Sequence, residues 1–159
     1  MEWVKSFQLN LESKVVAIDG KTSRRSFDGE IRPMHMVSAF VSELGIVLGQ
    51  LKVDDKSNEI TAIPKLLELM DLAGSIVTID AMGCQTKIAE KIIDRKADYV
   101  LGLKGNQGQL QEEVVLLFKN KPSQVKFAHE EKCDKGHGRL ETRRCTATEE
   151  IEWLKERHP

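Results

Sequence analysis

The chain has 159 residues, of which 40% are apolar and 31% are charged, and its formal net charge is −1. This length supports one hydrophobic core but not two full domains, and the composition excludes a disordered, collagen-like or coiled-coil protein. Because there is no overall basic excess, a nucleic-acid-binding surface would have to come from local clusters of Lys and Arg.

Targeting signals and cysteines bear on the compartment. The N-terminal residues lack the basic segment and apolar run of a signal peptide, and no apolar stretch reaches the roughly 18 residues that span a membrane. Cys84, Cys133 and Cys145 form no Cys-x-x-Cys pair, and their odd number favours reduced thiols. We therefore expect a cytoplasmic protein that does not contact a membrane.

The first third of the chain predicts three strands. Residues 14–19 (KVVAID) form a compact apolar run, and Gly20 after it predicts a buried strand followed by a turn. Residues 34–42 and 46–53 are rich in β-formers, and the Gly-containing segment at 43–45 between them favours a hairpin. The three strands are expected to form an antiparallel meander.

From residue 57 onward, helical and strand patterns alternate. Ser57 and Asn58 can cap a helix over residues 60–73, and Pro64 suggests that the helix begins nearer to the proline. Further strands are expected at 75–80 and 97–104, and further helices at 88–93 and 110–118. This alternation implies parallel crossovers. Three antiparallel strands followed by two parallel ones is the order of a ribonuclease H-like α/β sheet, although other α/β folds share the coarse pattern.

The character of the chain changes after residue 120. Residues 121–150 are polar, charged and β-leaning, which indicates a small hairpin or the start of an inserted region, and a short helix is expected near 151–155. We therefore expect an N-terminal stub at 1–13, the main α/β core at 14–120 and a β-rich insertion beginning at 121–159.

Two acids end apolar strands of this pattern. Asp19 and Asp80 each follow such a strand, and ligands of open sheets gather beyond the strand ends. If the two strands are neighbours, the carboxylates meet, and a divalent cation such as Mg²⁺ would relieve their repulsion. Two such metals can assist phosphodiester displacement. The alternative is that each acid is an ordinary turn or cap residue.

Basic residues accompany these acids. Lys21, Arg24 and Arg25 follow the first, and Lys104 sits at the end of the fifth strand, where they could contact phosphates. A further basic cluster lies in the insertion, where Arg139, Glu141 and Arg143 would share one face of a strand. Solvated loop and hairpin surfaces are the alternative for all of these.

Several long stretches resemble one known family. They are VVAIDGKTSRRS, the segment from HMVSAFVS through TIDAMGCQTKIAEKI, DYVLGLKGNQ and DKGHGRLETRR. Together they resemble the H-repeat-associated, Rhs-linked insertion-sequence transposases of the DDE class. The resemblance implies a ribonuclease H-like catalytic core, two divalent metals (Mg²⁺ or Mn²⁺), and cleavage and strand transfer of DNA at transposon ends and target. It also implies a possible homodimer in the DNA complex, with Asp19 and Asp80 as the first two acids.

The third acid of the family does not match cleanly. The family carries it as a Glu on a helix within an R-W-x-I-E-type motif after the β-rich insertion, and this motif is not found in the chain. Glu141 is a weak substitute, because its neighbours favour a strand. We therefore expect a fragment of the catalytic core, lacking the catalytic helix and inactive alone. The alternative is a non-catalytic remnant that binds DNA or inhibits full-length transposase by pairing with it.

Overall fold

The computed structural model describes residues 10–23, 34–53, 58–136 and 138–158. The chain divides into two compact units, Met1–Asn106 and Gln107–Pro159, and each is described by itself. This division lies earlier than the boundary expected at residue 120, because the helix that ends there groups with the hairpin that follows. Most of the expected stub at 1–13 lies outside the described residues. None of the described helices is long and apolar enough to cross a membrane.

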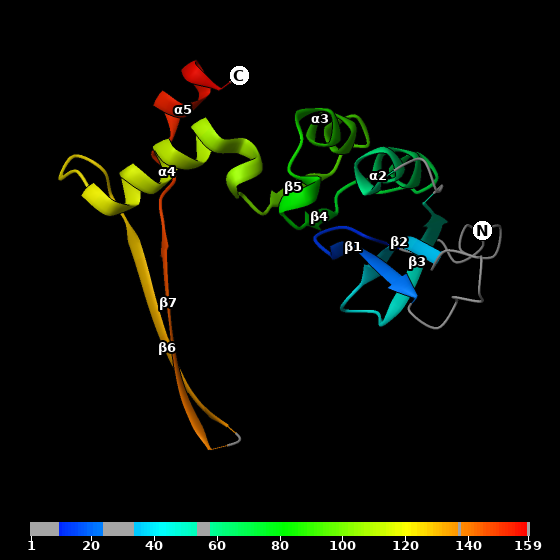
Figure 1. The fold of residues 1–159 in the computed structure, drawn as a ribbon, viewed down its shortest axis with the longest axis horizontal. Coiled ribbons are helices and arrows are strands. Elements are labelled where there is room, and N and C mark those ends of the chain that lie inside the picture. Colours follow the sequence, from blue (N-terminus) through cyan, green and yellow to red (C-terminus); the bar gives the residue numbers. More distant parts are fainter. Residues whose placement is uncertain (1–9, 24–33, 54–57, 137, 159) are drawn as a thin grey trace. The chain divides into compact units, whose positions relative to one another are not determined.

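A five-stranded mixed sheet organises the first unit (Figure 1). Its spatial order is β3-β2-β1-β4-β5, with antiparallel pairing of β1 to β2 and β2 to β3 and parallel pairing of β1 to β4 and β4 to β5. The strands are β1 (Val15–Ser23), β2 (Met34–Val41), β3 (Ile46–Lys52), β4 (Ile76–Ile79) and β5 (Asp98–Leu101). The expected meander and two parallel strands are therefore present.

One face of this sheet is covered by two helices, α2 (Glu59–Glu68) and α3 (Thr86–Asp94) (Figure 1). Apolar side chains from alternate strand positions pack against them, among them Val16, Val37 and Val77, which are 0% exposed. Ile63 and Leu66 fill the same core from α2. Burial of this surface, at about 25 cal/mol per Å² of apolar area, is the main stabilising contribution to the unit.

The start of α2 differs from the expectation based on Pro64. The helix begins at Glu59, and Pro64 lies inside it. Asn58 caps it, because its side chain accepts a hydrogen bond from the Thr61 amide while the Thr61 hydroxyl lies 3.4 Å from the Asn58 amide. This reciprocal cap satisfies the first amides of the helix, and so the helix starts well before the proline.

The expected turn after Asp19 is also wrong. β1 runs on to Ser23, because β2 pairs with it from Val16–Val41 to Ser23–Met34. Only the parallel partner, β4, stops at this level. Asp19 therefore lies within a strand whose neighbour on one side has just ended.

The face of the sheet opposite α2 and α3 carries a straight row of side chains. Successive register pairs link Val47 to Phe40, Phe40 to Ala17, Ala17 to Thr78, and Thr78 to Val100. Phe40, Val47 and Val100 remain 40%, 41% and 61% exposed, although they are apolar. Apart from Thr78, this row is therefore apolar from β3 across to β5.

The second unit combines two helices and a two-stranded ribbon. It contains α4 (Gly108–Asn120), β6 (Ala128–Gly136), β7 (Arg139–Ala147) and α5 (Glu152–Arg157). The antiparallel β6–β7 ribbon confirms the expected hairpin. Nearly every residue of the ribbon is exposed, and so backbone pairing rather than a core holds it together.

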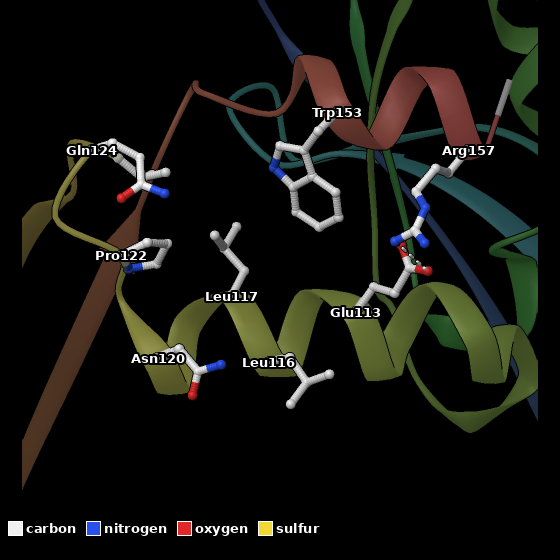
Figure 2. Close-up of a pocket in the computed structure, with 9 residues that line it drawn as sticks. Glu113, Leu116, Leu117, Asn120, Pro122, Gln124, Trp153 and Arg157 are labelled. Carbon is white, nitrogen blue, oxygen red and sulfur yellow. Dashed lines mark ion pairs between the residues drawn. The ribbon is translucent and has the colours of Figure 1, made fainter.

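Trp153 and Leu117 fill the space between α4 and α5 beside an open, mostly apolar pocket of about 410 Å³ (Figure 2). Both oxygens of Glu113 tie the two helices together. Oε1 lies 3.1 Å from Arg157 Nη1, and Oε2 lies 3.2 Å from His158 Nε2. A carboxylate shared in this way fixes the angle at which α5 docks on α4.

Candidate active site at the ends of β1 and β4

The two acids predicted from the sequence occupy equivalent positions on the central strands. The last register pair between β1 and β4 is Ile18 with Ile79, and Asp19 and Asp80 are the residues that follow. Neighbouring strands lie about 4.8 Å apart, and matched residues on parallel strands project from the same face. Both side chains are exposed. The two carboxylates therefore start from adjacent backbone positions and face solvent together.

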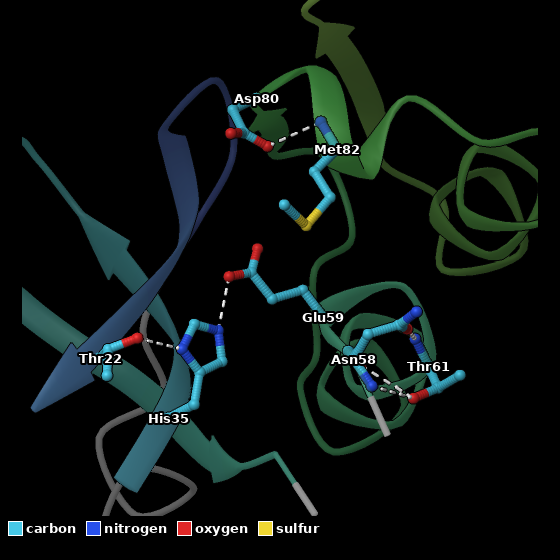
Figure 3. Close-up of polar contacts among 7 residues, drawn as sticks. All are labelled: Thr22, His35, Asn58, Glu59, Thr61, Asp80 and Met82. Atoms are coloured by element: carbon cyan, nitrogen blue, oxygen red, sulfur yellow. Dashed lines mark hydrogen bonds and ion pairs between the residues drawn. The ribbon is translucent and has the colours of Figure 1, made fainter. Parts of the chain in front are cut away.

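Asp80 is held in place by a tight turn and by the segment after β5. Its Oδ1 accepts a hydrogen bond from the Met82 amide at 3.0 Å, and so it caps the short 3-10 helix η1 (Ala81–Gly83) (Figure 3). The Asn106 side-chain amide donates to the Ala81 carbonyl at 2.6 Å. The cap role named as an alternative is therefore present, and it holds the Asp80 carboxylate in the turn.

The donor chemistry of this pair fits a hard divalent cation. Mg²⁺ is commonly bound by one or two carboxylates, with water and substrate phosphates completing the coordination. Asp19 and Asp80 supply two exposed carboxylates on neighbouring inner strands, at the level where β4 ends. Among the residues that the structure describes, no group of three His, Cys, Asp or Glu side chains is placed to hold a metal. Among the described residues, Asp19 and Asp80 are therefore the candidates to contribute to such a site.

A second polar group, missed in the sequence, adjoins this edge (Figure 3). Glu59, the first residue of α2, places its carboxylate against Gly20, where a Cβ atom would overlap it. Glu59 Oε1 lies 2.5 Å from His35 Nε2, and His35 Nδ1 lies 2.7 Å from Thr22 Oγ1. A glycine inside a strand, read here as a turn, was the signal for this close approach.

The expected phosphate contacts in the first unit are only partly described. Lys21 is an exposed residue of β1, two positions after Asp19. Lys104 is exposed three residues beyond β5, in the segment whose Asn106 holds the Asp80 turn. Arg24 and Arg25 lie outside the described residues. Lys21 therefore lies on the same strand as Asp19, and Lys104 lies in the segment that contacts the Asp80 turn.

A comparison with known protein families identifies the family of this chain. A family described as "Transposase DDE domain" matches residues 10–157. The chain belongs to the DDE transposase family. The resemblance found in the sequence is thereby confirmed, and the acid pair on β1 and β4 lies inside the matched region.

The similar proteins found for this DDE transposase chain include candidate transposases. It is 50% identical over 146 residues to YncI of Escherichia coli K12, a candidate transposase, covering 90% of this chain and 59% of YncI. It is 44% identical over 149 residues to YbfD of the same strain, a candidate transposase associated with the H repeat, covering 90% and 58% of the two chains. Against YncI of strain O157:H7 the identity is 51% over 146 residues, which is 37% of that protein. The chain thus spans roughly half the length of these relatives.

Among solved structures, a chain of the simian T-cell lymphotropic virus intasome in complex with a PP2A regulatory subunit aligns with 73% of this chain and 45% of its own length. The TM-score is 0.44 and the identity 12%, and at that level the likeness carries no argument.

Glu141, considered from the sequence as a weak candidate for the third acid, lies in the second unit. It occupies β7, where it pairs in register with Asp134 and binds Arg143 Nη2 at 2.8 Å. Arg139 lies on the same face of the ribbon, opposite Gly136. Arg143 therefore already has a carboxylate partner, and any phosphate would have to compete with Glu141 for it.

Proposed function

We propose that this chain forms the catalytic-core region of an insertion-sequence transposase, which cleaves DNA and transfers strands at the element's ends. The observation that carries the proposal is the placement of Asp19 and Asp80 directly after the last register pair of β1 and β4. The strand order of the first unit favours assignment to the ribonuclease H-like folds. We assign the first unit to the catalytic core, the second to the inserted region, and the protein to the cytoplasm.

In this proposal Asp19 and Asp80 bind Mg²⁺ or Mn²⁺. The bound cations would activate the attacking oxygen and stabilise the leaving oxygen of a phosphodiester. The chain's own contribution is to hold two charged carboxylates at one exposed edge, because β1 and β4 fix their backbones and the η1 turn fixes Asp80. Water would be the nucleophile in cleavage, and a DNA 3′-hydroxyl would be the nucleophile in strand transfer.

Metal binding tests the acid pair directly. Mn²⁺ titrations followed by electron paramagnetic resonance would compare the wild type with Asp19→Asn and Asp80→Asn. Asparagine keeps the size of aspartate and also caps helices well, so that Asp80→Asn removes charge while preserving the turn. We expect each variant to lose about tenfold or more in Mn²⁺ affinity.

The matched control is Asp98→Asn. Asp98 is an exposed aspartate that begins β5, and its register partner Ile76 begins β4, so that it lies at the other end of the parallel strands. This variant should bind Mn²⁺ like the wild type. Equal affinities for the wild type, Asp19→Asn and Asp80→Asn would contradict the proposal.

We further propose that DNA phosphates contact Lys21, Arg24, Arg25 and Lys104 near the acid pair and Arg139 and Arg143 on the ribbon. Fluorescence anisotropy with a labelled duplex should show weaker binding for alanine variants on any sequence. The slope of log affinity against log salt should fall by about one for each contact removed. An unchanged slope for Lys21→Ala and Lys104→Ala would show that these lysines do not contact DNA phosphates.

We also propose the homodimer in the DNA complex that the family resemblance implies. Sedimentation of the protein with and without DNA would test for it.

A further inference from the structure

Gly20 and Glu59 make a close contact immediately beside Asp19. The Glu59 carboxylate fills the space in which any other residue at position 20 would carry its Cβ. Glycine weakens a strand interior, and its presence there commonly marks a close approach by another group. Asp19 is the preceding residue, and so whatever fixes the backbone at Gly20 also fixes the starting point of the Asp19 side chain.

The Glu59 carboxylate is itself held from two sides. Its side chain is 14% exposed, and Oε1 meets His35 Nε2 at 2.5 Å. His35 is the register partner of Thr22 on β1 and lies 2.7 Å from its hydroxyl through Nδ1. The capped start of α2 fixes the other end of Glu59, because Asn58 is the preceding residue. The contacts therefore connect α2, β2 and β1 on the Asp19 side of the site.

We infer that the His35–Glu59 pair is a positioning element for Asp19. The pair holds the backbone of β1 at Gly20 and Thr22, beyond the point where β1 is paired with β4. The last register pair between these two strands is Ile18–Ile79. A single hydrogen bond makes a modest net contribution to stability, so that we assign this contact a role in geometry rather than in folding. The inference rests on the proposed function, because positioning has a consequence only if Asp19 binds the cation.

The first test is Mn²⁺ affinity in Glu59→Ala and His35→Ala. Removing a group that orients a metal ligand typically costs about tenfold or more in affinity, and we expect that loss in both variants. The double variant should be no weaker than either single one, because the two side chains act as a unit. The control is Glu68→Ala. Glu68 also makes an ion pair from α2, with Lys91 at 2.8 Å, but at the opposite end of the helix.

Glu59→Gln separates positioning from charge. Glutamine keeps the length of the side chain and an oxygen that accepts from His35, and so it should restore most of the affinity lost in Glu59→Ala. An affinity in Glu59→Gln as low as in Glu59→Ala would overturn the positioning role, because the loss would then follow charge alone. Wild-type affinity in folded Glu59→Ala and His35→Ala would overturn it equally.

A readout without metal completes the design. In ¹H–¹⁵N spectra of the metal-free protein, the Asp19 and Gly20 amide resonances should move in Glu59→Ala and stay in place in Glu68→Ala. If Glu59→Ala does not fold, as circular dichroism would reveal, the comparison is between His35→Ala, which should lose Mn²⁺ affinity and move the Asp19 and Gly20 resonances, and Glu59→Gln, which should keep most of the affinity. If the wild type does not bind Mn²⁺, or if Asp19→Asn and Asp80→Asn bind it as tightly as the wild type, the proposed function is wrong and this inference fails with it. Site-dependent binding that ignores Glu59 and His35 would defeat only the inference.

Discussion

Asn106 donates its side-chain amide to the main-chain carbonyl of Ala81 at 2.6 Å, joining the segment after β5 to the turn that presents Asp80. The same segment approaches the turn at Gly102, where a Cβ atom would lie 3.0 Å from the Ala81 nitrogen. The geometry of Asp80 therefore depends on residues some twenty positions later in the chain.

Loss of the Asn106 amide should loosen the Asp80 turn. Asn106→Ala removes a hydrogen bond to a carbonyl, which typically costs about 1 kcal/mol of net stability. We expect a comparable fall in the free energy of unfolding by urea, together with a faster hydrogen exchange of the Met82 amide. Asn106→Asp, which keeps the shape but loses the donor, should do the same. Protection of Met82 at the wild-type level in both variants would show that the turn holds without this contact.

Gly20 and Glu59 should show strong coupling in a double-mutant cycle. An added methyl group at position 20 forces the flexible Glu59 carboxylate to move, and overpacking of this kind costs about 1–3 kcal/mol. In a Glu59→Ala background the space is free, so Gly20→Ala should be neutral or stabilising, because alanine loses less chain entropy than glycine. Urea denaturation of the four proteins measures the cycle. Additive changes would mean that the two residues do not meet in solution.

The sheet was accessible to sequence reasoning because its signals are local. Alternating apolar residues marked β2 and β3, and the apolar period at 88–93 predicted the helix α3, in which Ile88 and Ile92 are buried. The sequence of elements favoured this strand order, although other α/β folds share the coarse pattern. These features depend on the pattern of side chains within one segment, which the chain displays directly.

The site was only half predictable because the rest of it depends on contacts between distant segments. The matched settings of Asp19 and Asp80 identified the acid pair. Gly20 was interpreted as a turn, since nothing in its own segment shows that a side chain from α2 packs against it. The contact of His35 with Glu59 was missed for the same reason, because His35 lies in a segment that shows only a strand pattern. Tertiary contacts of this kind override local propensity, and only the assembled sheet reveals them.

Glu43 should make the stability of the first unit depend on pH. Hydrogen bonds from its own amide and from the Val15 amide hold the pKa of this exposed carboxyl below 4.5, with a smaller contribution from Lys14. A lowered pKa in the folded state contributes stability that is present above pH 4.5 and is lost as the pH falls through the folded value. We therefore expect Glu43→Gln to be less stable than the wild type at pH 7 and equally stable near pH 2. Thermal unfolding at the two pH values provides the measurement, and a gap that persists at low pH would assign the effect to something other than ionisation.

Phe40 and Val41 offer the sharpest test of the sheet's two faces, because they are sequence neighbours on opposite sides. Val41 is 0% exposed beneath the helices, whereas Phe40 is 40% exposed in the row on the face opposite α2 and α3. Val41→Thr buries a hydroxyl, which costs about 1–3 kcal/mol unless it finds a partner. Phe40→Thr places its hydroxyl in water and should cost distinctly less, while reducing dye binding and self-association driven by exposed apolar surface. Chemical denaturation and light scattering would separate the two variants. Equal destabilisation by both would indicate that the Phe40 face is covered in solution, for example by a second copy of the chain.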